Sequence, residues 1–288
     1  MSTLETALDI LDCFHPDSPE LAVTEVARRL GIPKSTASRV LKTMAHRGLT
    51  EQCQDSKRYS VGPLPLRLGQ LYRARTKTLD LVAAAVERLA AETGFTGYVG
   101  ALDGTDLVIL RMTQGRYPVQ IVLEPGYRVP AFATAMGLAL LARETDAMLR
   151  TMLPSVMVHA PTGLRKSRAA LLGDLAAVRR QGWADVSEAT FPGIRAVAAA
   201  VGGAQDQHPV GLALSFPAGA ADAAEQVRIV AQVVAAANRI AAQTGDPLRK
   251  RPVTVTEGAG AVARQHVARS IVPRRAAQSK QSATGKSR

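Results

Sequence analysis

The chain has 288 residues, of which 47% are hydrophobic and 4% aromatic, and its formal net charge at pH 7 is +12. This size and composition are typical of one sizeable domain with a small partner, or of two modest domains, packed through aliphatic and alanine side chains. They exclude a disulfide-rich scaffold and a cysteine-based zinc site, because Cys13 and Cys53 are the only cysteines.

The positive charge lies mostly at the C-terminal end. Residues 249–288 contain ten Lys and Arg residues against one acid, Glu257, which gives this segment +9 and leaves +3 for residues 1–248. Residues 1–5 lack the cationic start of a secretory signal, and no uncharged apolar stretch approaches the ~20 residues of a membrane span. We therefore expect a cytoplasmic protein that does not enter a membrane.

The first predicted element is a helix that starts with a capping box at Ser2–Glu5 and ends before His15-Pro16. Its apolar positions follow helical spacing and form the stripe Leu4, Ala7, Leu8, Leu11 and Phe14. We expect this stripe to face the two helices that follow, and we expect Cys13 to be a core thiol.

Residues 21–47 are typical of a helix-turn-helix. Thr24 is the expected cap of a short helix that ends at Leu30, and Gly31-Ile32-Pro33 supplies the turn. The second helix spans Pro33–Arg47, and its apolar residues recur at positions i, i+3, i+4 and i+7. These predicted buried residues are Ala37, Val40, Leu41 and Met44.

The opposite face of the second helix carries short hydroxyls and long cations, which suit phosphate oxygens and guanine edges in a DNA groove. The predicted DNA contacts on this face are Lys34, Ser35, Thr36, Ser38, Arg39 and Lys42. Strands at 49–54 and 59–61 would follow as a hairpin whose tip offers Lys57 and Arg58 to the DNA backbone. An ordinary solvated charged helix is the alternative. The agreement of helix, turn, helix and basic hairpin favours DNA binding.

Residues 62–65, Gly-Pro-Leu-Pro, form a stiff break before a predicted linker helix at 66–75. Leucines and arginines alternate along this helix, which gives it two distinct sides. It would pack against a second copy of itself or fold back on its own chain, and the sequence leaves both arrangements open.

Beyond Leu79 the pattern changes to short β segments between helices. Strands are expected at 97–102, 107–112, 119–123, 183–187, 194–201 and 210–216, and helices at 79–93, 134–142, 147–152, 166–181 and 220–243. Hairpins grouped before and after a helical insert predict an antiparallel sheet with helices on its faces, and hence an α+β fold. The predicted domains are 1–63, a linker at 64–78 and 79–247, followed by a basic tail at 248–288 whose composition is typical of disorder.

No residue pattern predicts catalysis, a metal site or a cofactor. The five histidines are scattered, without Cys or acidic partners at metal-ligand spacing. Gly285-Lys286-Ser287 resembles the end of a phosphate-binding loop, but Lys280 stands where that loop needs glycine. Ser215 lacks the context of a nucleophile elbow. We therefore expect a protein that is not an enzyme.

Three motifs in this order resemble the isocitrate lyase regulator (IclR) family of bacterial transcription factors, over about Thr3–Pro247. They are VARRLGIPKSTASRVLKTMAHRGL at Val26–Leu49, GYRVPAFATAMGLALLA at Gly126–Ala142 and GWADVSEATFPGIRAVAAAV at Gly182–Val201. The resemblance implies a winged helix-turn-helix, a linker helix and a GAF-like effector domain that binds a small organic acid. It also implies homodimers or tetramers on partly palindromic double-stranded operator DNA.

By position, the resemblance implies an effector site around the small-residue helix and the later strands. Its residues would be Ala135, Met136, Val186, Ala196, Ser215 and Pro217, together with Thr134 and Gly137 at the helix start. The alternative for the apolar members of this set is plain core packing.

The residues of this inferred site also indicate the chemistry of the effector. In family members that bind very small oxo acids, the positions of Val186, Ala196 and Pro217 tend to be Asp, Cys and Ser. The apolar residues found here instead favour an aromatic or otherwise partly apolar acid, because burying unpaired polar ligand atoms is costly. Its carboxylate would meet backbone N–H groups at the helix start, or Arg111 or Arg195.

The first hypothesis is therefore a regulator in which the acid shifts the population of operator-compatible dimers. Two other functions fit parts of the sequence. A metabolic enzyme or plain small-molecule sensor would use the N-terminal domain only for protein contacts. A non-specific nucleic-acid binder would act through the basic tail.

Overall fold

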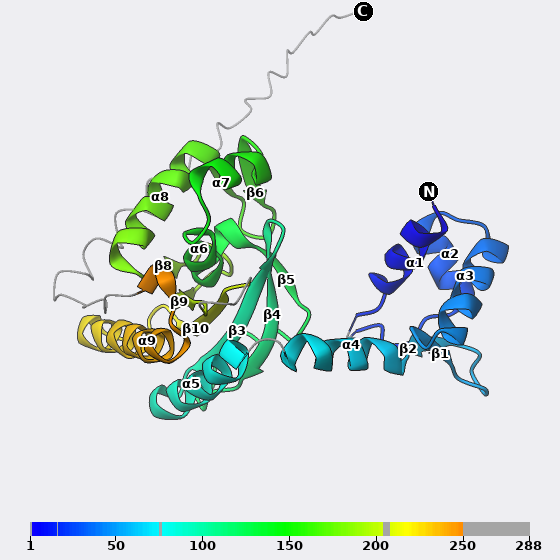
Figure 1. The fold of residues 1–288 in the computed structure, drawn as a ribbon, viewed down its shortest axis with the longest axis horizontal. Helices are drawn as coiled ribbons and strands as arrows, with labels where there is room; N and C mark the ends of the chain where they lie inside the picture. The colour runs from blue at the N-terminus through cyan, green and yellow to red at the C-terminus, as the bar shows by residue number, and fades with distance from the viewer. Residues whose placement is uncertain (1, 16, 75–76, 204–207, 250–288) are drawn as a thin grey trace, which may run out of the picture. The chain divides into compact units, whose positions relative to one another are not determined.

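The computed structural model describes residues 2–15, 17–74, 77–203 and 208–249 (Figure 1). The chain divides into two compact units, Met1–Asp80 and Leu81–Arg288. The domain boundaries expected from the sequence stay predictions, and positions 250–288 of the predicted tail lie outside the described residues. Within those residues, the structure contains no helix with the length and apolar character that a membrane crossing requires.

The N-terminal unit is a winged helix-turn-helix, as predicted. Its elements are α1 (Thr3–Leu11), α2 (Val23–Leu30), α3 (Lys34–His46), β1 (Thr50–Gln52), β2 (Tyr59–Val61) and α4 (Pro63–Ala74). The two strands pair antiparallel, with Thr50 opposite Val61 and Gln52 opposite Tyr59. Helix α4 covers most of the predicted linker helix.

Helix α3 buries the predicted stripe against α1, α2 and the hairpin. Ala37, Val40, Leu41 and Met44 are all buried, and they share one core cluster with Ile10, Val26 and Tyr59. The stripe predicted for α1 was partly wrong, because Leu4 and Leu8 are 70% and 54% exposed while Thr6 and Ile10 are buried. The other predicted residues, Ala7, Leu11 and Phe14, pack against the core cluster, and Cys13 lies in it as predicted. Helix α1 is apolar around much of its circumference, so helical periodicity alone did not select the inward face.

The start of α2 also differs from the prediction. The N-cap is Ala22, and the carboxylate of Glu25 accepts the backbone N–H of Ala22 at 2.8 Å, while Thr24 lies exposed inside the helix. Leu21 exchanges two backbone hydrogen bonds of 2.8 Å with Tyr59. This pairing keeps the chain extended through residue 22, so the helix begins afterwards. Gly31, with φ of 65°, ends it.

The C-terminal unit contains a main antiparallel sheet of order β5-β4-β3-β10-β9-β8. Its strands are β3 (Thr96–Asp103), β4 (Asp106–Thr113), β5 (Arg128–Pro130), β8 (Ala184–Ser187), β9 (Ile194–Val201) and β10 (Val210–Pro217). Its helices are α5 (Lys77–Thr93), α6 (Ala135–Leu141), α7 (Asp146–Met152), α8 (Arg168–Gln181) and α9 (Ala223–Thr244), with single 3₁₀ turns at Ala131–Ala133 and Pro247–Arg249. This α+β arrangement confirms the predicted fold class.

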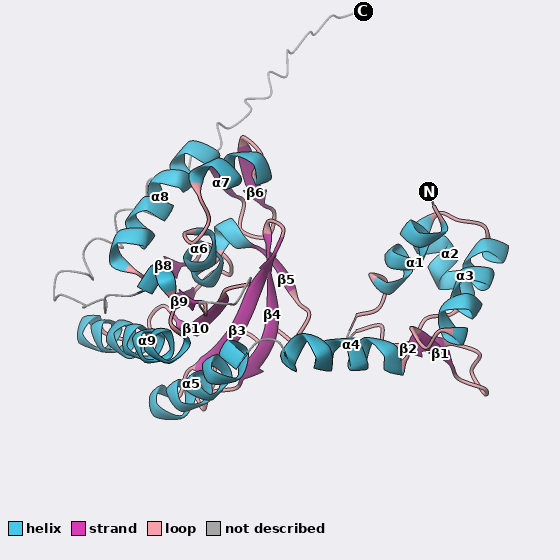
Figure 2. Ribbon diagram, viewed as in Figure 1, coloured by secondary structure: helices cyan, strands magenta, loops and turns pink. Residues whose placement is uncertain are grey.

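Helices cover both faces of the sheet. Figure 2 shows α5 and α9 on one side and α6, α7 and α8 on the other. On β9 the residues Ala198 and Ala200 belong to the core beneath α6 and α8, while the alternate residues point to the opposite face. Burial on both faces explains why β9 reads as a continuous apolar run.

Residues 119–123 do not form the predicted strand. The ladder next to β4 is instead taken by residues 126–130, since Ile109 accepts the N–H of Gly126 and donates to the carbonyl of Tyr127. Residues 119–123 remain coil, held partly by the side chain of Gln120, which donates to the carbonyls of Gly115 and Tyr117.

One further hairpin of the C-terminal unit was not predicted from the sequence. Strands β6 (Val156–His159) and β7 (Leu164–Ser167) pair antiparallel beyond α7. Ser167 caps α8 by accepting the N–H of Ala170, so this helix begins at Arg168 rather than at residue 166. Four-residue strands of mixed polarity carry too little period-two signal to separate them from a helix start.

Candidate functional sites: a basic helix face and an apolar pocket

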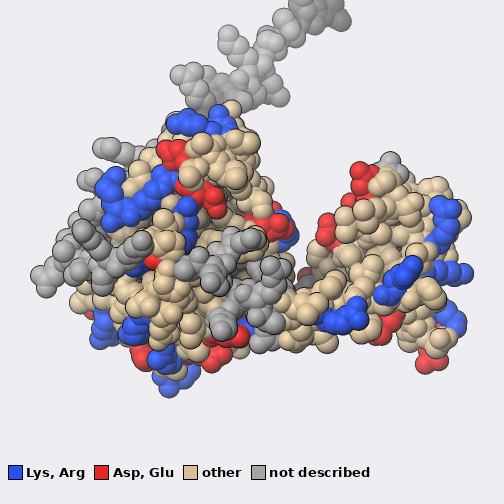
Figure 3. All heavy atoms as spheres, in the orientation of Figure 1, with Lys and Arg blue, Asp and Glu red and all other residues tan. Residues whose placement is uncertain are grey.

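The outer face of α3 carries the predicted DNA contacts. Lys34, Ser35, Arg39 and Lys42 are exposed, and Thr36 and Ser38 are half-buried at the edges of the face. Because the opposite side of α3 is fully buried, the core fixes the direction of these side chains. Lys and Arg side chains are visible along the side of the unit that carries α3 (Figure 3).

The two predicted wing contacts differ in their surroundings. Lys57 is exposed at the hairpin tip and adopts a left-handed backbone with φ of 55°. Arg58 turns toward α2, where it pairs with Glu25 at 2.7 Å and donates to the carbonyl of Glu20 at 2.9 Å. The backbone N–H of Ala22, and then Arg58, lower the pKa of Glu25. Arg58 therefore fastens the hairpin to α2.

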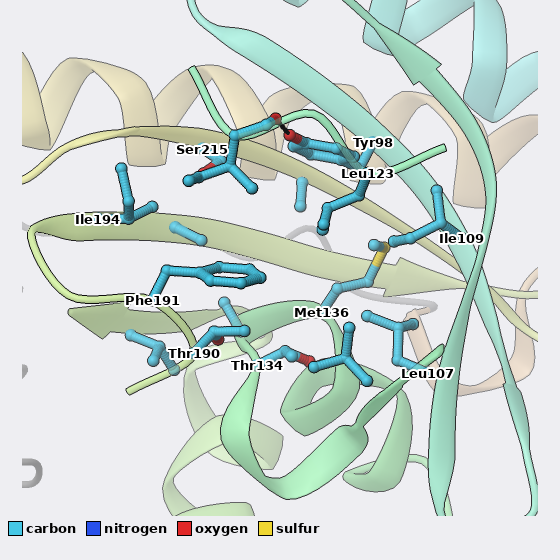
Figure 4. A pocket seen from close by; sticks show the side chains of 16 residues that line it. Tyr98, Leu107, Ile109, Leu123, Thr134, Met136, Thr190, Phe191, Ile194 and Ser215 are labelled. Carbon is cyan, nitrogen blue, oxygen red and sulfur yellow. Dashed lines mark hydrogen bonds between the residues drawn. The ribbon is translucent and has the colours of Figure 1, made fainter. Parts of the chain in front are cut away.

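An apolar pocket of about 60 Å³ lies between the start of α6 and the sheet (Figure 4). Six of the eight predicted effector residues line it. These are Thr134, Ala135, Met136, Val186, Ala196 and Ser215. Strand register brings two of these residues together, because Ser215 of β10 lies directly opposite Ala196 of β9.

The two remaining predicted residues, Gly137 and Pro217, are not part of the lining. Gly137 donates its N–H to the hydroxyl of Thr134 at 2.8 Å. A Cβ atom at Gly137 would lie 2.2 Å from the carbonyl oxygen of Ala131, so this glycine allows α6 to approach that turn closely. Pro217 pairs with Ile194 at the end of β10, two residues beyond Ser215.

The pocket also contains residues that sequence reasoning missed. They are Tyr98, Leu107, Ile109, Ile121, Leu123, Val129, Thr190, Phe191, Ile194 and Ala213. The sequence carries a signal for only part of this set: Leu107 and Ile109 alternate on one strand, and Tyr98 stands opposite Ala213 once β3 and β10 are known to be neighbours. Ile121 and Phe191 lie outside the strands and helices, where no periodicity places them.

Four hydroxyl groups supply the polar side chains of the lining. Tyr98 donates to the backbone carbonyl of Ile121, and Thr190 donates to the carbonyl of Ala133 at 2.6 Å. Thr134 caps α6, whereas the hydroxyl of Ser215 makes no hydrogen bond within the described residues. Burial raises the pKa of Tyr98, so its phenol remains a neutral donor at physiological pH.

Neither arginine proposed for the carboxylate lines the pocket. The side chain of Arg195 is buried beside Asp185, with Nε 2.8 Å from the carboxylate, so its charge is already paired. Arg111 is also absent from the lining. Neither guanidinium thus lines the pocket, and the carboxylate contact expected of these arginines stays a prediction. Among the described residues, no group of three or more His, Cys, Asp and Glu side chains is arranged to hold a metal ion.

Both units match known families. Residues 3–53 match the IclR helix-turn-helix domain, and residues 72–242 match the C-terminal domain of bacterial transcriptional regulator IclR. The HTH-type transcriptional regulator BhcR of Paracoccus denitrificans is 32% identical over 215 residues, which cover 74% of this chain and 77% of that protein.

Two solved structures share the fold. An IclR transcriptional regulator from Alicyclobacillus acidocaldarius aligns with a TM-score of 0.72 at 24% identity, covering 84% of this chain and 98% of that one. An IclR homolog from Microbacterium hydrocarbonoxydans, complexed with 4-hydroxybenzoate, aligns with a TM-score of 0.67 at 22% identity, covering 85% of this chain and 99% of that one.

Proposed function

Because the chain belongs to the IclR family of DNA-binding bacterial transcriptional regulators, we propose that it binds operator DNA through α3 and that a small organic acid in the apolar pocket modulates this binding. The observation that carries the proposal is the two-sided character of α3. Its aliphatic side is fully buried, and its outer side presents cations and hydroxyls to solvent. A regulator of this kind works where the chromosome lies, in the bacterial cytoplasm.

In the proposed complex α3 enters the major groove. Arg39, which is exposed near the middle of the helix, would grip a guanine edge with two N–H donors. Lys34, Ser35, Thr36, Ser38 and Lys42 would contact phosphates or neighbouring base edges. Lys57 would reach the adjacent backbone. Arg58 would contribute chiefly by holding the hairpin against Glu25.

The pocket favours a partly apolar acid as effector. Its lining is aliphatic and aromatic apart from four hydroxyls and includes no Lys, Arg or His side chain. We propose that the carboxylate accepts from the hydroxyl of Ser215, which is uncommitted in the described part of the chain, from Tyr98 once that phenol releases Ile121, and from backbone N–H groups at the start of α6. The homolog solved with 4-hydroxybenzoate supports this chemical class.

The pocket must open further to hold an aromatic ring. A cavity of about 60 Å³ is well below the roughly 150 Å³ of a cavity that accepts benzene. Ile121 and Leu123 lie on coil, and Phe191 lies on the loop between β8 and β9. We propose that these two segments move apart when the acid binds.

Exposed leucines support a homodimer or a tetramer as the working form. Leu66 and Leu71 on α4 are 68% and 60% exposed, so the N-terminal unit does not bury them. An apolar helix face of this kind is typical of contacts between copies. Comparing sedimentation of the parent chain with that of Leu71→Glu tests the proposal, because the charged variant should shift toward monomer.

Footprinting on the DNA upstream of the protein's own gene and of its neighbours tests the proposed function. We expect a protected, partly palindromic site, and we expect 4-hydroxybenzoate or a related aromatic acid to change the protein concentration that half-protects it. A pattern without preferred sites at physiological salt would contradict operator binding.

A further inference from the structure

A second cavity, of about 350 Å³, lies at the other end of α6 from the apolar pocket. The pocket uses residues 134–136 at the start of this helix, whereas the second cavity uses Ala139 and Ala142 near its end. On β9 the two cavities are lined by Ala196 and Ala200, which are about 13 Å apart along a strand. They are therefore separate sites in one domain.

Three arginines line this second cavity, and two of them are already neutralised. Arg143 forms a two-pronged contact with the carboxylate of Asp246, at 2.9 and 2.8 Å. Arg179 pairs with Asp146 at 2.7 Å and also donates to the carbonyl of Ala142 at 2.8 Å. Both guanidinium groups thus have a carboxylate partner.

Arg249 is the exception. Its Nε donates to Asn238 and its Nη1 to the carbonyl of Gly182, at 2.9 and 2.8 Å, and both acceptors are uncharged. Its Nη2 is buried without a hydrogen-bond partner among the described residues. Burial lowers the pKa of Arg249 to about 10, which reflects a cation withdrawn from water.

The charge of Asp246 acts on Arg249, but the oxygens of this carboxylate are already taken. They accept hydrogen bonds from Arg143, from the N–H of Gly202 at 2.8 Å and from the N–H of Leu248 at 3.0 Å. A buried donor without a partner is rare in folded proteins, and a bound ion or water molecule is one way to satisfy it. An anion would satisfy both the charge and the open N–H of Arg249.

We infer that this cavity is a second ligand site, for a small monocarboxylate with a short aliphatic chain. The carboxylate accepts from Nη2 of Arg249, and the chain packs against Ala139, Val178 and Leu248. Glu144 also lines the cavity. Its negative charge opposes every added negative charge, so a monocarboxylate is favoured over dicarboxylates and phosphate. This site is distinct from the apolar pocket of the proposed function.

The probe for this site is 4,4,4-trifluorobutyrate, titrated with the full chain at constant ionic strength and followed by ¹⁹F NMR. We expect saturable binding that is weakened at least tenfold in Arg249→Met, which keeps the apolar stem and removes the guanidinium. Arg150→Met, which removes an exposed arginine on α7, is the matched control and should bind as the parent chain does.

Two further variants keep the test decisive if Arg249→Met unfolds. Ala139→Leu narrows the cavity without touching an arginine and should also weaken binding, whereas Ala196→Leu, in the apolar pocket, should leave it unchanged. The inference is overturned if the parent chain shows no saturable binding or if Ala139→Leu binds normally. It is also overturned if Ala196→Leu abolishes binding, or if phosphate displaces the probe more readily than butyrate does.

Discussion

The hydroxyl of Tyr98 donates a hydrogen bond to the backbone carbonyl of Ile121, and this bond joins the sheet floor of the pocket to the coil that forms one wall (Figure 4). Ile121 itself lines the pocket, so the same coil residue contributes both the accepting carbonyl and part of the apolar surface. A ligand that accepts the hydrogen bond of the Tyr98 hydroxyl would compete with the carbonyl of Ile121. Ligand binding would thereby release the coil.

Tyr98→Phe should therefore destabilise the protein and weaken binding of the aromatic acid. Losing one hydrogen bond costs about 0.5–1.5 kcal/mol of unfolding free energy. The binding free energy of a ligand that uses the same hydroxyl should fall by a similar amount. Urea denaturation and calorimetric titration with 4-hydroxybenzoate measure the two effects. Tyr117→Phe is the control, because the Tyr117 ring lies 5.5 Å from that of Phe95 and its hydroxyl makes no hydrogen bond in the described part of the chain. Equal stability and affinity in both variants would contradict the competition between ligand and Ile121.

Ala196→Leu should remove the response to the acid without removing DNA binding. The substitution adds three carbon atoms to a cavity of about 60 Å³, and overpacking of this kind typically costs about 1–3 kcal/mol. A mobility-shift titration with and without the acid measures the effect. The control is Ala91→Leu on the exposed side of α5. If Ala196→Leu still responds to the acid with unchanged affinity, the effector does not occupy this pocket.

The sequence predicted the parts of the fold in which one face of an element is buried and the other is not. Helix α3 has a single apolar stripe, so its spacing identified Ala37, Val40, Leu41 and Met44 correctly. Helix α1 has apolar residues on several sides, and the same reasoning selected Leu4 and Leu8 in place of Ile10. Which side faces inward depends on packing partners that local periodicity does not contain.

The pocket residues were likewise predictable only where they lie on regular helices and strands or at their caps. Positions carried over from the family resemblance identified Ala135, Met136 and Ser215, because these lie on regular elements whose register is fixed. Ile121 and Phe191 could not be found in this way, since coil segments reach the pocket through hydrogen bonds such as that of Tyr98 rather than through a repeating pattern. The engagement of Arg195 by Asp185 depends on the pairing of β8 with β9, which spacing alone does not reveal.

Asp246→Asn should destabilise the C-terminal unit. It should also make the stability of this unit less dependent on pH in the acidic range. Burial acts to raise the pKa of Asp246, but hydrogen bonds from Arg143 and from the N–H of Gly202 outweigh it and hold the pKa below the ordinary 3.8. The stabilising contribution is therefore present above about pH 4 and is lost as the pH falls through the lowered value. Removing one partner of a buried ion pair costs about 3–5 kcal/mol.

Urea denaturation at pH 7 and at steps down to pH 3 measures the unfolding free energy of Asp246→Asn relative to that of the parent chain. Asp146→Asn serves as the comparison, because its pair with Arg179 is half exposed and should be worth at most about 1 kcal/mol. A loss of stability in Asp246→Asn no larger than that in Asp146→Asn would show that the buried pair of Asp246 with Arg143 stabilises the protein no more than the half-exposed pair does.

Substitutions on α3 and on the hairpin tip should separate base recognition from backbone attraction. Arg39→Ala should weaken binding to the cognate operator by about 1–3 kcal/mol and relax the base preference at one position, because a guanidinium that grips guanine discriminates between bases. Lys57→Ala should weaken binding to all DNA sequences alike and make the salt dependence shallower by about one ion, since a phosphate contact releases a counterion but reads no base. Both residues are exposed in the structure, so neither change removes core packing.

Mobility-shift titrations on the cognate operator, on single-base variants and on unrelated DNA, each at several salt concentrations, measure these effects. Arg150→Ala on α7 is the control, because it removes an exposed cation outside the helix-turn-helix and should leave both affinity and salt slope unchanged. Unchanged operator affinity in Arg39→Ala would place the reading face elsewhere on α3. A base-specific loss in Lys57→Ala would instead move the wing from the backbone into a groove, because only a contact to a base edge or to sequence-dependent groove shape distinguishes one sequence from another.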